Sequence, residues 1–365
     1  MTPLAKIIRE EMRERGPMDL GRYMALCLGH PEYGYYMTRD PFGVKGDFTT
    51  APEISQIFGE MIGVWLADTW EKMGAPANFI LLECGPGRGT LMADALRATK
   101  NVAGFHAALA LHLLEMSPVL RQAQEEALKA HNPVWHAGLE SVPEDMPLLV
   151  IGNEFLDALP VHQLVRQKDG WAERTVEPAQ GGGFALGARE ASQEMIALVP
   201  PSLLPWQDRD VVEVSPILIR FLKSLCFRLK KQKGSALFID YGYMSSAAGE
   251  TLQAVHKHRP VSILDAPGQA DITAHVNFET IGTISMAEGV TVHGPVPQGA
   301  FLERLGAGIR AAALCNNATE SQEKDIAESM NRLCAKNRMG TLFKALAICD
   351  DPALDLSGFQ AVEGP

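Results

Sequence analysis

The amino-acid sequence predicts an α/β protein whose core is a doubly wound, largely parallel sheet. From residue 79 onward, short apolar runs alternate with segments of helical periodicity, as expected for strands joined by crossover helices. The first apolar run leads into ECGPGRGT, residues 83–90, where a strand would turn into a helix beside a ligand. With 365 residues, of which 46% are apolar, the chain is long enough for one large domain with insertions or for two domains.

Composition argues against several classes of function. A formal net charge of -11 disfavours a general nucleic-acid-binding or anionic-membrane-binding surface. The six cysteines are scattered without a CxxC pair or clustered histidines, so we expect no metal site and a reducing compartment. No run of about 18 apolar residues predicts a membrane span, and the acids Glu10, Glu11 and Glu14 are unlike a transit peptide. We therefore expect a cytoplasmic protein with no nucleic-acid partner and no membrane span.

Residues 1–78 are predicted to form a helical N-terminal region with one conspicuous loop at 30–52. Thr50–Glu53 fit a capping box, and apolar residues then recur at helical spacing over 54–66. The loop is rich in glycine and aromatic residues and carries Asp47, so it is either a lid over a site or an irregular packed loop.

Region 79–365 contains the alternating elements. In order, the pattern predicts a strand at 79–84, a helix at 90–99, a strand at 109–116, a helix at 117–131 with Ser117 as its cap, strands at 133–138, 147–155 and 235–242, and a last strand at 340–348. Insertions at about 161–210 and 243–280 interrupt this pattern and are expected to form the walls of a groove. Ligands of such sheets bind beyond the carboxyl ends of the strands.

The glycine-rich stretch predicts a nucleoside-type cofactor. Gly85, Gly87 and Gly89 follow a GxGxG spacing, which departs from the GxGxxG of dinucleotide sites. Glu83 would repel a pyrophosphate and attract an ammonium group, and Glu115 could accept hydrogen bonds from a ribose diol. S-adenosyl-L-methionine meets these demands, although a glycine-rich turn that binds nothing remains the alternative. The cofactor-binding residues that we expect are Glu83, Gly85, Pro86, Gly87, Gly89, Glu115, Met116, Leu139 and Asn153.

A second polar cluster, Asn153, Glu154 and Asp157, follows the fourth strand. In a helical turn, Glu154 and Asp157 would share one face, because they are three residues apart. Paired carboxylates suit a guanidinium, which forms forked, planar hydrogen bonds. The alternative is that Asn153 caps a turn and Asp157 is merely solvated.

Several stretches together resemble the MidA-like class I methyltransferases, whose mitochondrial member is the arginine methyltransferase required for respiratory complex I assembly. They are GYYMTRDPFGVKGDFTTAPEISQIFGE, LLECGPGRGTLMADALR, NEFLDALPVHQ, FIDYG and APGQADITAHVNF. The similarity extends from about residue 18 to the final strand. It implies a class I methyltransferase domain with a smaller substrate-side subdomain, S-adenosyl-L-methionine as cofactor, and an arginine of a protein, such as a complex I subunit, as acceptor. It also implies the mitochondrial matrix for a eukaryotic chain, and a homodimer is one expected assembly.

The resemblance also implies roles for particular residues. It places Glu83 and the three glycines in the cofactor motif, Glu115 at the ribose, and Asn153, Glu154, Phe155 and Asp157 in the family's signature after the fourth strand. Asn277 stands where members commonly have an acid, so we assign it no charged role.

We expect Glu154 and Asp157 to clamp the acceptor, with Asp240 and Tyr241 lining the same edge. His275, with Asp271, could reach the acceptor channel from the 243–280 insertion or be structural.

Two other functions fit the sequence. One is a methyltransferase acting on a small molecule or another side chain. The other is an assembly chaperone for a respiratory subunit that keeps the cofactor pocket only as structure. A nicotinamide-dependent dehydrogenase is disfavoured by the glycine spacing and by Glu83.

Overall fold

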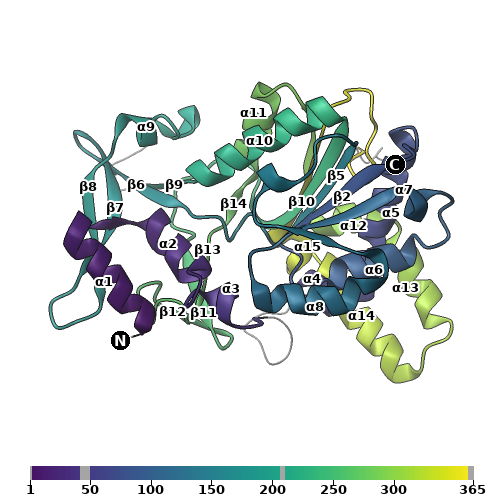
Figure 1. Cartoon of the computed structure of the whole chain (residues 1–365), viewed down its shortest axis with the longest axis horizontal. Coiled ribbons are helices and arrows are strands. Elements are labelled where there is room, and N and C mark those ends of the chain that lie inside the picture. The colour runs from purple at the N-terminus through teal and green to yellow at the C-terminus, as the bar shows by residue number, and fades with distance from the viewer. Residues whose placement is uncertain (1, 42–49, 206–209, 361–365) are drawn as a thin grey trace.

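The computed structural model describes residues 2–41, 50–205 and 210–360 and confirms the doubly wound α/β fold (Figure 1). The central sheet has the order β15-β16-β10-β5-β2-β3-β4, with the short β14 beside the end of β10. Its strands are β2 (Phe79–Cys84), β3 (Leu109–Leu114), β4 (Val134–His136), β5 (Leu148–Asn153), β10 (Gly234–Tyr243), β14 (Val276–Asn277), β15 (Thr291–Pro297) and β16 (Phe343–Cys349). Strands β4, β3, β2, β5 and β10 are parallel, whereas β16 runs antiparallel to both of its neighbours.

Helices cover both faces of this sheet, because its strands are apolar on both sides and every residue of β2 and β5 is buried. One face packs against α10 (Pro216–Gln232) and α11 (Phe278–Ala287). The helices that pack with the other face are α5 (Gln56–Lys72), α6 (Thr90–Ala98), α7 (Phe105–Ala108), α8 (Pro118–Leu128), α12 (Gln298–Arg304), α13 (Ala307–Cys315), α14 (Glu320–Cys334) and α15 (Met339–Leu342).

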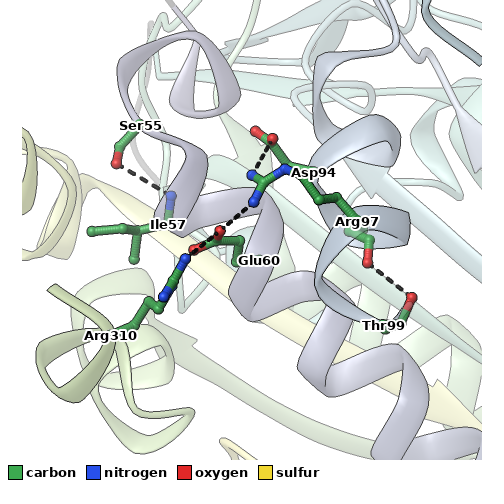
Figure 2. A network of polar contacts seen from close by, with 8 residues as sticks. Ser55, Ile57, Glu60, Asp94, Arg97, Thr99 and Arg310 are labelled. Carbon is green, nitrogen blue, oxygen red and sulfur yellow. Dashed lines mark hydrogen bonds and ion pairs between the residues drawn. The ribbon is translucent and has the colours of Figure 1, made fainter. Parts of the chain in front are cut away.

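Helices α5 and α6 approach closely because α5 carries glycines where they meet. A Cβ atom built on Gly63 would lie 2.6 Å from the carbonyl oxygen of Ala95. Beside this contact, the carboxylate of Glu60 on α5 accepts hydrogen bonds from Arg97 of α6 and Arg310 of α13 (Figure 2). This buried carboxylate joins three helices that are distant in sequence.

A second lobe lies at one end of the molecule, where α1 (Pro3–Arg15) and α2 (Leu20–Gly29) pack beside β7 (Figure 1). It contains a sheet of β1 (Met18–Asp19), β6 (His162–Gln167), β7 (Gly170–Pro178), β8 (Phe184–Glu190) and β9 (Val211–Val214), and another of β11 (Gln253–His256), β12 (Arg259–Val261) and β13 (Asp271–Thr273). Its core joins apolar residues of α1 and α2 to residues of β7, β11 and β13. Region 1–78 is therefore divided, because α1 and α2 pack with the two insertions and α5 packs with the central sheet.

The remaining helical elements are short. They are α3 (Tyr35–Thr38), α4 (Ala51–Ile54), α9 (Gln193–Ile196) and the 3-10 turns at Lys129–His131, Leu139–Ser141 and Pro201–Leu203. Among the described residues, no helix is both long enough and apolar enough to cross a membrane.

The expected capping box at Thr50–Glu53 is not formed. The Thr50 side chain makes no capping hydrogen bond, and the helix is interrupted at Ser55, whose hydroxyl caps α5 instead. Glu53 accepts a hydrogen bond of 2.6 Å from Thr90 at the start of α6. Residues 42–49 of the expected lid-like loop at 30–52, which include Asp47, lie outside the described residues. The last strand begins at Phe343, because the residues before it form α15.

Candidate functional site

A cavity of about 1130 Å³ opens at the carboxyl edge of the parallel strands. Its floor comes from the ends of β2, β3, β5 and β10, and the other walls come from α2 and α3, the 243–280 insertion, α10, and α14 with α15. None of the described residues of the 161–210 insertion lines the cavity, so only one of the two expected groove walls is present here. The reason is that β6 to β9 form their own sheet against α1 and α2.

The glycine-rich turn shapes one side of the cavity. Gly85, Gly87 and Gly89 all have positive φ, at 66°, 56° and 82°, a conformation that side-chain-bearing residues rarely adopt. Gly85 and Gly87 line the cavity, and Pro86 lines an adjacent hollow of about 40 Å³. Gly89 instead starts α6, and a Cβ there would lie 3.2 Å from a methyl group of Leu128. Gly89 is therefore required for the turn into α6 and for close packing against Leu128 of α8.

Glu83 and Asn153 place unsatisfied polar atoms at this turn. Both side chains are buried, both residues line the smaller hollow, and neither Glu83 Oε2 nor Asn153 Oδ1 has a hydrogen-bond partner among the described residues. Burial, with a smaller contribution from Glu115, raises the pKa of the Glu83 carboxyl to about 8. A buried acceptor without a partner is costly. Two such oxygens on residues that line one hollow therefore fit an ammonium group, which brings both positive charge and N–H donors.

Glu115 lines the cavity directly beyond the end of β3. Its Oε1 accepts from the N–H of Ser117 at 2.7 Å, and its Oε2 accepts from Gln124 at 3.0 Å. The backbone N–H of Met116 also favours the ionised carboxylate. A carboxylate has about four lone pairs, so the oriented group retains capacity to accept from a diol. Met116, which is exposed, and Leu139, which is buried, line the same cavity. These positions fit the apolar faces of a nucleoside.

Glu154 and Asp157 both line the cavity, although the helical turn expected between them is absent. Glu154 has a φ of 50°, an uncommon conformation for a residue other than glycine that is often found at functional sites. Its Oε1 accepts from the N–H of Ala51 at 3.0 Å. Burial raises the pKa of Glu154 to about 7 and that of Asp157 to about 6. Tyr241 favours the ionised form of Asp157 and so partly offsets the effect of burial on its pKa.

Asp240 does not line the cavity. It is fully buried, and its Oδ2 accepts from the backbone N–H groups of Phe155, Leu156 and Asp157 at 2.9–3.2 Å. Asp240 therefore holds the backbone of the loop that carries the two acidic side chains.

Tyr241 and His275 do line the cavity, with their rings edge to face at 5.2 Å. Burial lowers the pKa of His275, which favours its neutral form.

Asn277 caps α11 by accepting from the N–H of Thr280 at 3.1 Å, a role that requires no charge.

Sequence reasoning missed Tyr36, Thr273 and Arg332, which also line the cavity. Tyr36 lies in the GYYMT stretch, and its phenol donates to Asp271 across 235 positions of sequence. No local pattern signals such a contact, because only the packing of the N-terminal region against the 243–280 insertion creates it.

Comparisons with known proteins agree with this geometry. A family model described as "Putative S-adenosyl-L-methionine-dependent methyltransferase" matches residues 61–296. The "Protein arginine methyltransferase NDUFAF7 homolog, mitochondrial" of Drosophila melanogaster is 37% identical, covering 94% of this chain and 84% of the relative. The Homo sapiens "Protein arginine methyltransferase NDUFAF7, mitochondrial" is 31% identical, covering 99% and 86%.

A solved structure is also similar over nearly the whole chain. A Burkholderia thailandensis protein bound to S-adenosyl-homocysteine superposes with a TM-score of 0.83 at 29% sequence identity, covering 97% of this chain and 94% of that chain. The agreement therefore includes the second lobe as well as the central sheet.

Proposed function

The chain belongs to the family of S-adenosyl-L-methionine-dependent methyltransferases, and we propose that its acceptor is the guanidinium group of an arginine side chain in a protein. The observation that carries this proposal is the pair of acidic side chains, Glu154 and Asp157, in the cavity that also contains the glycine-rich turn. The names of the similar Drosophila and human proteins support the same acceptor.

We propose that the cofactor lies along the carboxyl ends of β2 and β3. Glu83 and Asn153 would hold its ammonium group, since each offers an oxygen that has no hydrogen-bond partner in the described part of the chain. The backbone of Gly85 and Gly87 would leave room for the amino-acid portion, and Glu115 would bind the ribose hydroxyls. Met116 and Leu139 would contact the base.

The bound cofactor supplies an electrophilic methyl group on a sulfonium. The protein's task is to hold a nitrogen in line with that methyl group and to remove a proton, because a free guanidinium loses its proton only above pH 12. Glu154 and Asp157 would bind the guanidinium through charge-assisted hydrogen bonds. With a pKa of about 7, Glu154 is suited to receive the proton near neutral pH. Asp240 would act indirectly, by fixing the loop that carries both groups.

The remaining proposals concern partners and location. We propose that a protein acceptor enters the cavity from the solvent and that a respiratory complex I subunit is one such acceptor. A homodimer is proposed as the assembly. The location proposed is the cytoplasm of a bacterial cell, or the mitochondrial matrix of a eukaryotic one, since the similar animal proteins are named as mitochondrial.

Methyl transfer into protein tests this function. Labelled S-adenosyl-L-methionine is incubated with the protein and with an extract of cells that lack it, and protein-bound label is counted. We expect Glu154→Gln and Asp157→Asn each to lower the initial rate by at least about a hundredfold, the scale of lost acid-base catalysis. Affinity for S-adenosyl-homocysteine should change less than twofold, because neither group holds the cofactor.

The matched control is Asp265→Asn, which removes an exposed carboxylate of the 243–280 insertion and should leave the rate unchanged. Label confined to small molecules would replace the proposal with the small-molecule alternative. Full activity of both Glu154→Gln and Asp157→Asn would refute the proposal that these two side chains bind the guanidinium.

A further inference from the structure

A third carboxyl group reaches the acceptor side of the cavity from outside the central sheet. Asp271 opens β13 in the 243–280 insertion, is 5% exposed, and lines the cavity together with Glu154 and Asp157. Its Oδ1 accepts a hydrogen bond of 2.7 Å from the phenol of Tyr36 on α3. One wall of the cavity is thus made jointly by the insertion and the N-terminal region.

A backbone hydrogen bond links the segments that carry Asp157 and Asp271. The N–H of Ala274, three residues after Asp271, donates to the backbone carbonyl of Asp157 at 3.0 Å and so ties β13 to the loop after β5. The pKa of Tyr36 is raised by burial and then by the charges of Asp271 and Asp157. Both residues line the cavity, so the two carboxyl groups belong to one site.

Tyr36 is also fixed from the cofactor side. Its backbone carbonyl accepts a hydrogen bond of 2.6 Å from the hydroxyl of Ser117. The N–H of Ser117 in turn donates to Glu115 at 2.7 Å. The residue that orients Asp271 is thus held by the segment that presents the proposed ribose-binding carboxylate.

We propose that Asp271 is a third carboxylate of the acceptor site and that Tyr36 is the positioning residue that aims it. The inference rests on the proposed function, because it requires a guanidinium beside Glu154 and Asp157. A guanidinium has five N–H donors. With one nitrogen turned toward the methyl group, Asp271 can accept from donors that the other two carboxylates leave unpaired, and unpaired buried donors are costly.

Binding of a small guanidinium probe tests the inference without a protein substrate. Protein saturated with S-adenosyl-homocysteine is titrated calorimetrically with ethylguanidinium chloride, and with ethylammonium chloride for comparison. We expect the wild type to prefer ethylguanidinium, and Asp271→Asn to weaken its binding by at least about tenfold, as for a lost charge-assisted hydrogen bond. Affinity for S-adenosyl-homocysteine should change less than twofold.

Tyr36→Phe separates positioning from mere structural support. Without the phenol, Asp271 loses the hydrogen bond that aims it, so Tyr36→Phe should reduce the preference for ethylguanidinium over ethylammonium while affinity for S-adenosyl-homocysteine changes less than twofold. An unchanged preference overturns the role of Tyr36, and this preference remains the deciding readout if Asp271→Asn fails to bind S-adenosyl-homocysteine. Asp265→Asn and Tyr33→Phe, which lie in the same two segments but outside the cavity lining, are the matched controls and should behave as wild type.

The outcomes distinguish this inference from the proposed function. If Asp271→Asn binds ethylguanidinium as tightly as wild type while Glu154→Gln loses binding, the role of Asp271 is refuted. Binding of the guanidinium by Glu154 and Asp157 is then still supported. If the wild type does not prefer ethylguanidinium over ethylammonium, guanidinium binding by Glu154 and Asp157 and the added role of Asp271 are both refuted.

Discussion

Glu83 is the residue at which burial and ligand binding are most directly linked. Its carboxyl group is enclosed, one oxygen lacks a partner among the described residues, and its pKa is raised to about 8. Such a group weakens the unliganded fold whenever it is ionised. A cationic ligand would relieve this cost, which explains why a carboxylate can be tolerated at the end of a buried strand.

Replacing Glu83 with Gln should therefore change both the affinity for S-adenosyl-homocysteine and its pH dependence. In the wild type, the ligand ammonium favours ionised Glu83, so affinity should rise between pH 6 and pH 8 by up to about tenfold per pH unit. Glu83→Gln should flatten this dependence and weaken binding at pH 8 by about ten- to a hundredfold. Calorimetry at several pH values measures both.

Glu14→Gln, which removes an exposed carboxylate on α1, is the control and should keep the wild-type profile. A Glu83→Gln variant with an unchanged pH profile would show that the ammonium is held elsewhere.

At the scale of single elements, the strand-to-helix units of the central sheet were the most predictable. The strand at 79–84 has the predicted bounds, and Ser117 caps the next crossover helix, accepting from the N–H of Leu120 at 3.3 Å. These units carry their signals locally, as apolar runs, glycines and caps. Strand β15 was not predicted, because its sequence, TVHGPVP, contains Gly294 and two prolines and is only half-buried.

The site residues also differ in whether a local sequence pattern signals them. Glu154 and Asp157 could be inferred because they end a strand at the expected edge of the sheet. The role of Asp240 could not, since only the three-dimensional structure shows three backbone N–H groups turned toward its carboxylate. Tyr36 and Asp271 meet through packing between lobes, which no local pattern encodes.

The contact between α5 and α6 gives a test of packing. Gly63→Ala should lower the free energy of unfolding by about 1–3 kcal/mol, the cost of overpacking, because its methyl group would meet the backbone of Ala95. Gly308→Ala is the matched control on α13, where nothing lies within 4 Å of the added Cβ. That change should be neutral or stabilise by up to about 1 kcal/mol. Urea denaturation measures both, and equal effects would contradict the close approach.

At the scale of the whole molecule, the site makes the unliganded protein sensitive to pH. The folded pKa values of Glu83 and Glu154, about 8 and about 7, both exceed the ordinary value of 4.5. Stability contributed by their neutral forms is complete below that ordinary value and is lost as the pH rises through the folded values. The fold is thus most stable when the carboxyl groups of Glu83 and Glu154 are neutral, or when a bound cation compensates their ionised forms.

Unfolding by urea at pH 6.5 and pH 8.5 tests this linkage. Glu83 alone should lower the free energy of unfolding by about 2 kcal/mol over this range. The loss should shrink in Glu83→Gln, which has no carboxyl group at this position, and in protein saturated with S-adenosyl-homocysteine, whose ammonium group would pair with ionised Glu83. An equal loss in all three samples would assign the pH dependence to other groups.

The most direct test of the central claim is the chemical identity of the methylated group. Protein labelled by the wild-type enzyme with methyl-labelled S-adenosyl-L-methionine is hydrolysed to amino acids, and the labelled products are separated and identified. The account predicts label in methylarginine, absent when Glu154→Gln replaces the wild type. Label in another methylated amino acid, produced by an enzyme that binds S-adenosyl-homocysteine normally, would contradict the guanidinium acceptor.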